Sequence, residues 1–450
     1  MFAYYYDLIE SRILKHHYNK INREIWALAL PNIISNISVP LLSTVDTALM
    51  GRLSATHLGA VGISAMIFNF LYWNFGFLRM GTTGMTAQAY GASDMRLAML
   101  TLYRAMGLGF FIAIILFLLR DPLADLAIKA FQVDGKQAEL VLEYFYIRIW
   151  AAPAYMGFLC LIGWFFGMQN AIIPLVLTIV VNVLNMGSSF YFVQKMGWEI
   201  RGVAIGTLIA QYSGVLIGTL ILLIKYRNIT IRTTWASFFK IDEFRVFIST
   251  NKDLFIRTVL LTFVFAFFYS QSSAFGTISL AVSVVLMQFI NWMSYGIDGI
   301  AFASESLVGK YKGARDGQVL DDTIRLVFLW GFVFAVAYGG LYGIFSDSLF
   351  RVFTDEQAVV VAGREYHFWL VLIPVIGFAS YLWDGVFIGL TASKSMRNAM
   401  ILPCILFLFV YYGFRSSLEL HSLLLALSVF LLARGLIQTR MFWKEGVDLD

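Results

Sequence analysis

Twelve long apolar runs constrain this chain more than any other feature of its sequence. Each has roughly the 20 residues that a helix needs to cross about 30 Å of hydrocarbon. Because lipid offers no partners for backbone polar groups, and because the runs lack the alternation of barrel strands, the elements are helices. The sequence therefore predicts an all-α integral membrane protein with twelve transmembrane helices. The runs lie at about 25–50, 57–82, 97–119, 140–166, 171–193, 201–224, 246–269, 278–308, 322–345, 359–390, 396–413 and 418–438.

Composition supports the bilayer as the main partner of the chain. Apolar residues make up 59% of the 450 residues and charged residues 14%, which is more apolar surface than a soluble core of this size can bury. The net charge of +5 is assigned to Lys and Arg in cytoplasmic loops, so no nucleic-acid partner is expected. Cys160 and Cys404 lie in apolar runs without a CxxC partner or nearby His, so we expect no metal centre and no structural disulfide.

The charges of the loops predict how the chain is oriented and divided. Basic residues gather in the amino-terminal segment, in the linker between the two halves and in the 310–315 loop, whereas the loops at 120–139 and 347–365 balance their bases with acids. The positive-inside rule then places both termini in the cytoplasm, in a multi-pass protein of the cell inner membrane. The predicted parts are a cytoplasmic segment 1–23, an N-lobe 24–224, a cytoplasmic linker 225–245, a C-lobe 246–441 and a cytoplasmic tail 442–450.

The two halves of the sequence resemble each other. A shift of 222 residues places Gly91-Ala92-x-Asp94 on Gly313-Ala314-x-Asp316, and the same shift places Gly163-x-Phe165-x-Gly167 on Gly385-x-Phe387-x-Gly389. One ungapped shift that serves two separate regions indicates an internal duplication. Since each half has an even number of spans, both halves share one topology, and a substrate path between them is expected.

Several motifs resemble a known family. They are Val45-Asp46-Thr47, the segment 78–89 (LRMGTTGMTAQA), the segment 298–305 (DGIAFASE), and the segment 383–389 (WDGVFIG) continuing to Ser395-Met396-Arg397-Asn398. These segments are similar to those of the multidrug and toxic compound extrusion (MATE) transporters, and within them to the DinF-like branch. The resemblance implies two pseudo-symmetric six-helix lobes, alternating access between them, and export driven by inward flow of H⁺ or Na⁺.

Asp46 is the first candidate for the cation-coupling site. It lies within the apolar frame 41–49, where a carboxylate costs several kcal/mol and is usually kept for a function or paired. At about 1.5 Å per residue, Asp46 lies roughly 30 Å along its helix, in the same half of the lobe as Asn185 and Thr207. The resemblance implies that Asp46, Asn185 and Thr207 form the amino-terminal cation site. The alternatives are an Asp at a helix end facing water, and helix-packing hydrogen bonds for the other two.

Ser189 and Pro31 bear on how this site works. Many relatives carry a second Asp where this chain has Ser189. Because Na⁺ prefers several hard oxygen ligands, and because a lone carboxylate in a low-dielectric pocket favours its protonated form, we predict H⁺ as the coupling ion and no other cofactor. Na⁺ at Asp46, Asn185 and Thr207 is the alternative. Pro31 breaks the backbone ladder of the first span, and the resemblance suggests that it lets this helix bend when the carboxylate changes protonation; a simple kink is the alternative.

Further charges lie inside the predicted spans. Arg79, Asp298, Glu305 and Asp384 are the candidate cleft or gating charges. Arg79 and Glu305 are predicted to face the cleft and to help close its cytoplasmic end; the alternative is an ion pair within one lobe that only makes burial tolerable. The NorM branch of the family places a second cation site on a Glu of the seventh helix and an Asp of the tenth. Asp384 corresponds to the latter, but the seventh span has no Glu, so that site is not expected intact.

Other residues of the spans receive simpler interpretations. Arg104 and Arg148 are interpreted as snorkelling side chains, which keep the charged head in water. The adaptable apolar residues that are candidates for lining the cleft are Phe68, Tyr72, Trp73, Met287, Trp292 and Met293.

Together these features predict a monomeric secondary active transporter that exports small amphiphilic or cationic compounds by antiport with H⁺. A flippase for lipid-linked oligosaccharides or lipids is the alternative of related architecture, and it would need a basic cleft for diphosphate groups. A membrane-embedded enzyme is a further alternative, although the sequence has no HExxH or GxSxG motif. An ATP-driven pump is disfavoured because there is no GxxxxGK[ST] loop.

Overall fold

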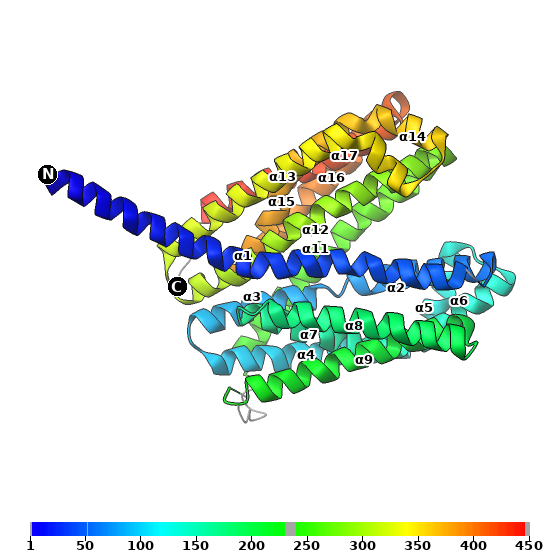
Figure 1. The fold of residues 1–450 in the computed structure, drawn as a ribbon, viewed down its shortest axis with the longest axis horizontal. Coiled ribbons are helices and arrows are strands. Elements are labelled where there is room, and N and C mark those ends of the chain that lie inside the picture. The colour runs from blue at the N-terminus through cyan, green and yellow to red at the C-terminus, as the bar shows by residue number, and fades with distance from the viewer. Residues whose placement is uncertain (1, 52, 230–239, 446–450) are drawn as a thin grey trace. The chain divides into compact units, whose positions relative to one another are not determined.

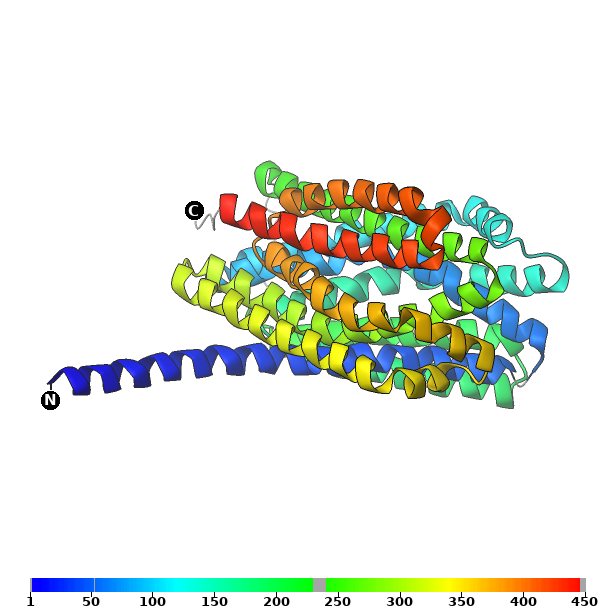
Figure 2. The same ribbon diagram turned by 90° about the horizontal axis from the view of Figure 1, so that it is seen from above.

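The computed structural model describes residues 2–51, 53–229 and 240–445, and within helix α1 (Phe2–Gly51) it describes the side chains of residues 16–38 and 46–51. Residues 230–239 of the predicted 225–245 linker and residues 446–450 of the predicted 442–450 tail therefore lie outside the described residues. In the described part, eleven helical segments are long and apolar enough to cross a membrane. With α1, which carries the first predicted span, they give the twelve-helix fold that the sequence predicts (Figures 1 and 2).

Eight described α-helices follow α1 in the first half, and they make up five membrane spans and one short helix. Two of the predicted spans are broken, at residues 74–76 and by a 3-10 turn at Ile149–Ala151, and one short amphipathic helix, α5, lies in a predicted loop. The elements are α2 (Ala55–Trp73), α3 (Phe77–Gly91), α4 (Met95–Leu118), α5 (Arg120–Phe131), α6 (Gly135–Arg148), α7 (Ala152–Gly167), α8 (Ile172–Phe190) and α9 (Glu199–Lys225).

The second half repeats this plan. Its tenth span is divided into α14 and α15 by a 3-10 turn at Arg364–Tyr366, as the fourth span is divided into α6 and α7. The elements are α11 (Ile241–Ser272), α12 (Thr277–Gly313), α13 (Gly317–Phe353), α14 (Gln357–Gly363), α15 (His367–Gly389), α16 (Ser393–Leu418) and α17 (Leu420–Glu445).

The chain divides into two compact units, residues 34–251 and residues 1–33 with 252–450. The boundary lies inside α1, so the helix contributes its first part to the second unit and its remainder to the first. Polar contacts attach the first part of α1 to α12 and α13. Trp330 donates to Asn22 Oδ1 at 2.8 Å, and Lys310 Nζ pairs with Glu24 at 2.8 Å. The sequence analysis placed the start of the N-lobe at residue 24, whereas the division of the chain falls after residue 33. Both positions lie inside the continuous helix α1.

The internal duplication is visible in the geometry of equivalent turns. Asp94 caps α4 by accepting a hydrogen bond from the backbone N–H of Leu97 at 2.8 Å. Asp316, which lies 222 residues later, caps α13 by accepting one from Val319 at 3.2 Å. Both aspartates end the Gly-Ala-x-Asp motif that the sequence comparison matched. The repeated motif is therefore an N-terminal helix cap in both halves.

The second repeated motif is a close contact between two helices. A Cβ atom at Gly163 of α7 would come closer than 3.0 Å to the carbonyl oxygen of Arg79 in α3, and one at Gly385 of α15 would meet that of Ala301 in α12 in the same way. Each pair lies within one unit. The glycines therefore permit the same backbone approach in each half, which requires a residue without a side chain.

Candidate cation-coupling site

Three polar side chains of α8 and α9 form a chain of hydrogen bonds inside the first unit. Asn185 Nδ2 donates to Thr207 Oγ1 at 2.9 Å, and the Thr207 hydroxyl donates to the carbonyl oxygen of Val203 at 2.9 Å. Ser189 Oγ lies 3.3 Å from Asn185 Oδ1. Asn185, Ser189 and Thr207 are all buried. The helices approach closely here because Gly206 has no side chain; a Cβ at that position would lie 2.8 Å from Ser189 Oγ.

Asp46 joins this group from the end of α1. Its Oδ1 atom is buried and has no hydrogen-bond partner among the described residues. The Ser189 hydroxyl is within hydrogen-bonding reach of the carboxylate as well as of Asn185. Since a hydroxyl has one proton, it can donate to only one of these two acceptors at a time, and an ionised Asp46 is the stronger acceptor. The structure thus brings together Asp46, Asn185, Ser189 and Thr207, as the sequence reasoning placed them.

Arg148 lies at the same site. It ends α6, is 8% exposed, and its guanidinium carbon lies 5.4 Å from the ring centroid of Phe68 and 5.3 Å from that of Tyr72. Its charge acts on Asp46, and its Nη1 atom is buried without a hydrogen-bond partner in the described part of the chain. The interpretation of Arg148 as a snorkelling side chain is therefore wrong. Aromatic faces stabilise the cation inside the unit instead of water at its edge.

Tyr144 connects the parts of the site. It lies one helical turn before Arg148, is buried, and is within hydrogen-bonding reach of both Thr207 and Arg148. The charge of Asp46 also acts on it. The site therefore combines one carboxylate, one guanidinium, and neutral hydroxyl and amide groups.

Arg104 is a second arginine for which the snorkelling interpretation is wrong. Its side chain is 1% exposed, and its Nη2 atom lies 3.0 Å from the carboxylate of Glu243. An ion pair inside the first unit takes the place of interfacial water, because a buried guanidinium requires a compensating charge.

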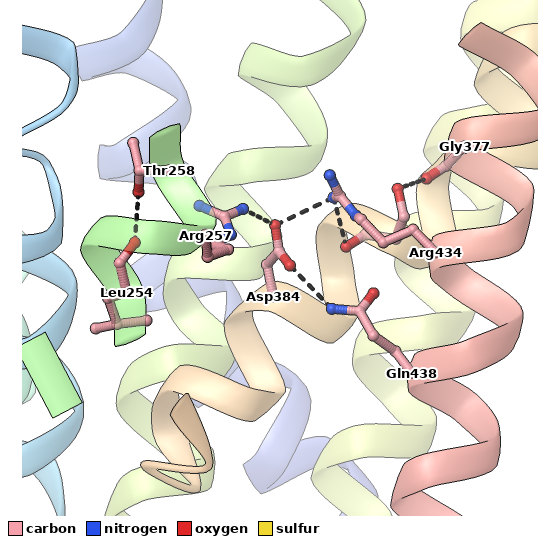
Figure 3. A network of polar contacts seen from close by, with 8 residues as sticks. Leu254, Arg257, Thr258, Gly377, Asp384, Arg434 and Gln438 are labelled. Atoms are coloured by element: carbon pink, nitrogen blue, oxygen red, sulfur yellow. Dashed lines mark hydrogen bonds and ion pairs between the residues drawn. The ribbon is translucent and has the colours of Figure 1, made fainter. Parts of the chain in front are cut away.

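A second charged cluster lies in the other unit (Figure 3). Asp384 of α15 receives an ion pair from Arg257 of α11, a second from Arg434 Nη2 of α17 at 3.1 Å, and a hydrogen bond from Gln438 Nε2 at 3.0 Å. Arg434 also donates to the carbonyl oxygen of Ser380 at 2.9 Å. This carboxylate is the one that a NorM-like second cation site would use. Its lone pairs are directed to guanidinium and amide donors, so it is poorly suited to bind a further cation.

The remaining candidate charges lie in both units. Asp298 acts electrostatically on Arg434, which is a member of the cluster around Asp384. For Asp384 the structure therefore favours an ion pair within one unit over a cleft-facing gate. Glu305 of α12 and Arg79 of α3 are buried, in different units. Their joint role in closing the cleft remains a prediction.

Pro31 lies in α1, and the candidate lining residues lie in α2 and α12. Pro31 is buried in α1, two residues before the boundary between the units, and its role as a hinge remains a prediction. The neighbouring Asn32 side chain donates to the carbonyl oxygen of Leu28 at 2.9 Å. Phe68 and Tyr72 contact Arg148, whereas Trp73 is 60% exposed. The buried Met287 and Met293 and the half-buried Trp292 lie on α12.

Sequence reasoning missed Arg257 and Arg434. Both lie inside apolar runs, at 246–269 and 418–438. The rule that selected Asp46, a charge within an apolar frame, selects them equally well. The sequence did not reveal that the two arginines share one carboxylate, because their helices are brought together only in the fold.

Comparison with known proteins identifies the family. The MatE family model matches residues 31–191 and again residues 254–412, an offset that agrees with the internal duplication. The chain is 35% identical to DNA damage-inducible protein F of Escherichia coli K12, over 94% of this chain and 93% of that protein. It is 24% identical to the probable multidrug resistance protein NorM of Thermotoga maritima, over 79% and 77% of the two chains.

A solved structure shows the same fold. The bent form of the Vibrio cholerae MATE transporter VcmN matches with a TM-score of 0.83 and 18% identity, over 95% of this chain and 98% of that chain. The two matches to one family model, the identity to the E. coli protein and the shared fold agree with one another. The chain is therefore a multi-pass membrane protein of the MATE family, whose members are transporters and not enzymes.

Proposed function

We propose that this protein exports small amphiphilic or cationic compounds by antiport with H⁺, through alternating access between two lobes. The coupling proton is carried by Asp46, and Asn185, Ser189 and Thr207 stabilise the carboxylate in its two protonation states. The names of two relatives support the substrate class: one is called a probable multidrug resistance protein, another multidrug and toxin extrusion protein 1. The observation that carries the proposal is the buried Oδ1 atom of Asp46, which has no hydrogen-bond partner in the described parts of the chain.

A buried carboxylate suits proton coupling because its two forms differ strongly in solvation. The charged form is costly in a low-dielectric site unless it is paired, and the protonated form is not. Asp46 forms no ion pair with any described residue, so one proton can move on and off as the site opens to either side of the membrane. By contrast, Asp384 forms ion pairs with two guanidinium groups. Asp46, in the first lobe, is therefore the single coupling carboxylate.

The charges favour this proposal over a lipid flippase. A cleft for diphosphate headgroups needs basic side chains that are available to the ligand. Among the described buried arginines, Arg257 and Arg434 are bound to Asp384, and Arg104 is bound to Glu243. Most of the buried positive charge is thus committed within each unit, which leaves cationic or neutral cargo as the better match.

The test is efflux of an organic cation from proteoliposomes under an imposed pH gradient. Asp46→Asn is expected to reduce gradient-driven efflux to the level of protein-free vesicles, because the amide does not exchange a proton. The control is Asp121→Asn, which removes an exposed carboxylate of α5 and is expected to leave efflux unchanged. Gradient-driven efflux by the Asp46→Asn variant at the wild-type rate would remove Asp46 from the mechanism. Movement of a labelled lipid, without efflux of the cation, would favour a flippase.

The setting of the transporter follows from the same proposal. We place it in the cell inner membrane as a monomer, with both termini in the cytoplasm and its substrates and the bilayer as its partners. The basic loops on one side support this orientation. Arg79 and Glu305, which are buried charges of the two units, are proposed to help close the cytoplasmic end.

A further inference from the structure

We propose that Arg148 is a built-in cation that excludes Na⁺ from the Asp46 site and so restricts coupling to protons. The inference rests on the proposed function, since it concerns which ion the coupling site accepts. It makes Arg148 a residue that determines ion specificity, although it is not itself a carrier of the ion.

The first step is that Arg148 is held in place. Its guanidinium lies against the rings of Phe68 and Tyr72. Tyr72 is itself stacked on Tyr155, with ring centroids 4.4 Å apart and an interplanar angle of 16°. Tyr144 adds a hydrogen-bonding contact from within α6. The side chain is buried and held by α2, α6 and α7, so its charge remains near the site and does not swing to water.

The second step is the charge balance. With Asp46 ionised, the site carries one negative and one positive group, and it is electrically neutral before any ion binds. An incoming Na⁺ gains the attraction of Asp46 and meets the repulsion of Arg148. In a buried site this repulsion is weakly screened. A proton meets the same repulsion, but it forms a covalent O–H bond, and the burial of Asp46 favours the neutral acid.

The third step is the shortage of oxygen ligands. A hard cation needs several oxygens around it. Thr207 Oγ1 already accepts from Asn185 and donates to Val203, and Asn185 Oδ1 has Ser189 Oγ at 3.3 Å. Ser189 contributes a hydroxyl to the site and no second carboxylate. One carboxylate therefore faces a fixed positive charge, with few further oxygens available for Na⁺.

The experiment measures binding of radioactive ²²Na⁺ to the purified full-length protein at alkaline pH, where Asp46 is ionised. We expect wild type to bind Na⁺ no better than Asp46→Asn. Replacing Arg148 by Met keeps an unbranched apolar side chain and removes the charge, and we expect Na⁺ affinity to rise at least tenfold. The matched variant Arg148→Lys keeps the positive charge and is expected to behave like wild type. The double variant Asp46→Asn with Arg148→Met is expected to bind Na⁺ as weakly as wild type, because the carboxylate that would bind the ion is absent.

Two results would overturn the inference: Asp46-dependent Na⁺ binding by wild type as tight as by Arg148→Met, or no gain in Arg148→Met. Should Arg148→Met fail to elute as a folded protein, Arg148→Gln also removes the positive charge and is measured in its place. The assay also separates this inference from the proposed function. If Asp46→Asn still transports, proton coupling at Asp46 is refuted, and an Asp46-dependent gain of Na⁺ binding in Arg148→Met would still assign the exclusion to Arg148.

Discussion

At the scale of single residues, this chain tolerates buried carboxylates in two different ways. Asp384 is surrounded by donors, two of them guanidinium groups. Asp46 has a buried oxygen without a hydrogen bond to any side chain or backbone group that the structure describes, and within that part of the chain Ser189 and the charge of Arg148 act on it as stabilising groups. The sequence marks both aspartates as equal, because each is an acid inside an apolar run. Only the partners distinguish them, and those partners come from helices distant in the sequence.

This difference predicts effects of different size for the same substitution. Asp384→Asn leaves Arg257 and Arg434 buried without their shared counter-charge, which should cost about 3–5 kcal/mol of stability. Asp46→Asn removes a carboxylate without a direct ion pair, and Arg148 keeps its contacts with Phe68 and Tyr72, so a much smaller loss of stability is expected. Thermal unfolding of the two purified variants in detergent checks this, with a clear drop in Tm expected only for Asp384→Asn. Equal Tm values for the two variants would show that the Asp384 network does not stabilise the fold.

At the scale of elements, periodicity and length predicted the helices well and their interruptions poorly. Every predicted span has a helix, because about 20 apolar residues in lipid allow little else. The breaks at residues 74–76 and at Ile149–Ala151 were not predicted, since a local turn changes the apolar count of a span very little. The short helix α5 was missed for a different reason. With 12 residues it is too short for a membrane span, and it lies in the charged segment 120–139 that was interpreted as a loop.

The repeated glycine contacts give a prediction at this scale. Gly163→Ala and Gly385→Ala each place a Cβ against a backbone carbonyl of a neighbouring helix, and since backbone cannot move aside cheaply, each should cost about 1–3 kcal/mol. Gly413→Ala in α16 is the control, because nothing lies within 4 Å of its added Cβ. Thermal stability in detergent is the measurement. A loss of stability in only one of the first two variants would mean that the two halves do not share this packing.

At the scale of the whole molecule, the duplication explains the fold but not the site. The 222-residue shift aligns caps and glycine contacts in both halves. It places Phe268 opposite Asp46 and Ile162 opposite Asp384, so neither charged site has a counterpart. The scaffold is thus the symmetric part of the molecule, and each unit has its own charged cluster. The apolar runs and the repeat therefore predict the architecture, whereas the two charged sites depend on side chains that the repeat does not relate.

The even number of spans gives the last prediction, on orientation. Twelve crossings bring both termini to one side, and the basic loops place that side in the cytoplasm. A cysteine at the exposed Asp355, which precedes α14, should react with a membrane-impermeant maleimide in intact cells. A cysteine at the exposed Arg227, which follows α9, should react only after the membrane is opened. The native Cys160 and Cys404 are buried and should give little background. Labelling of the Arg227 position in intact cells would invert the topology, and with it the direction of proton-driven transport proposed for Asp46.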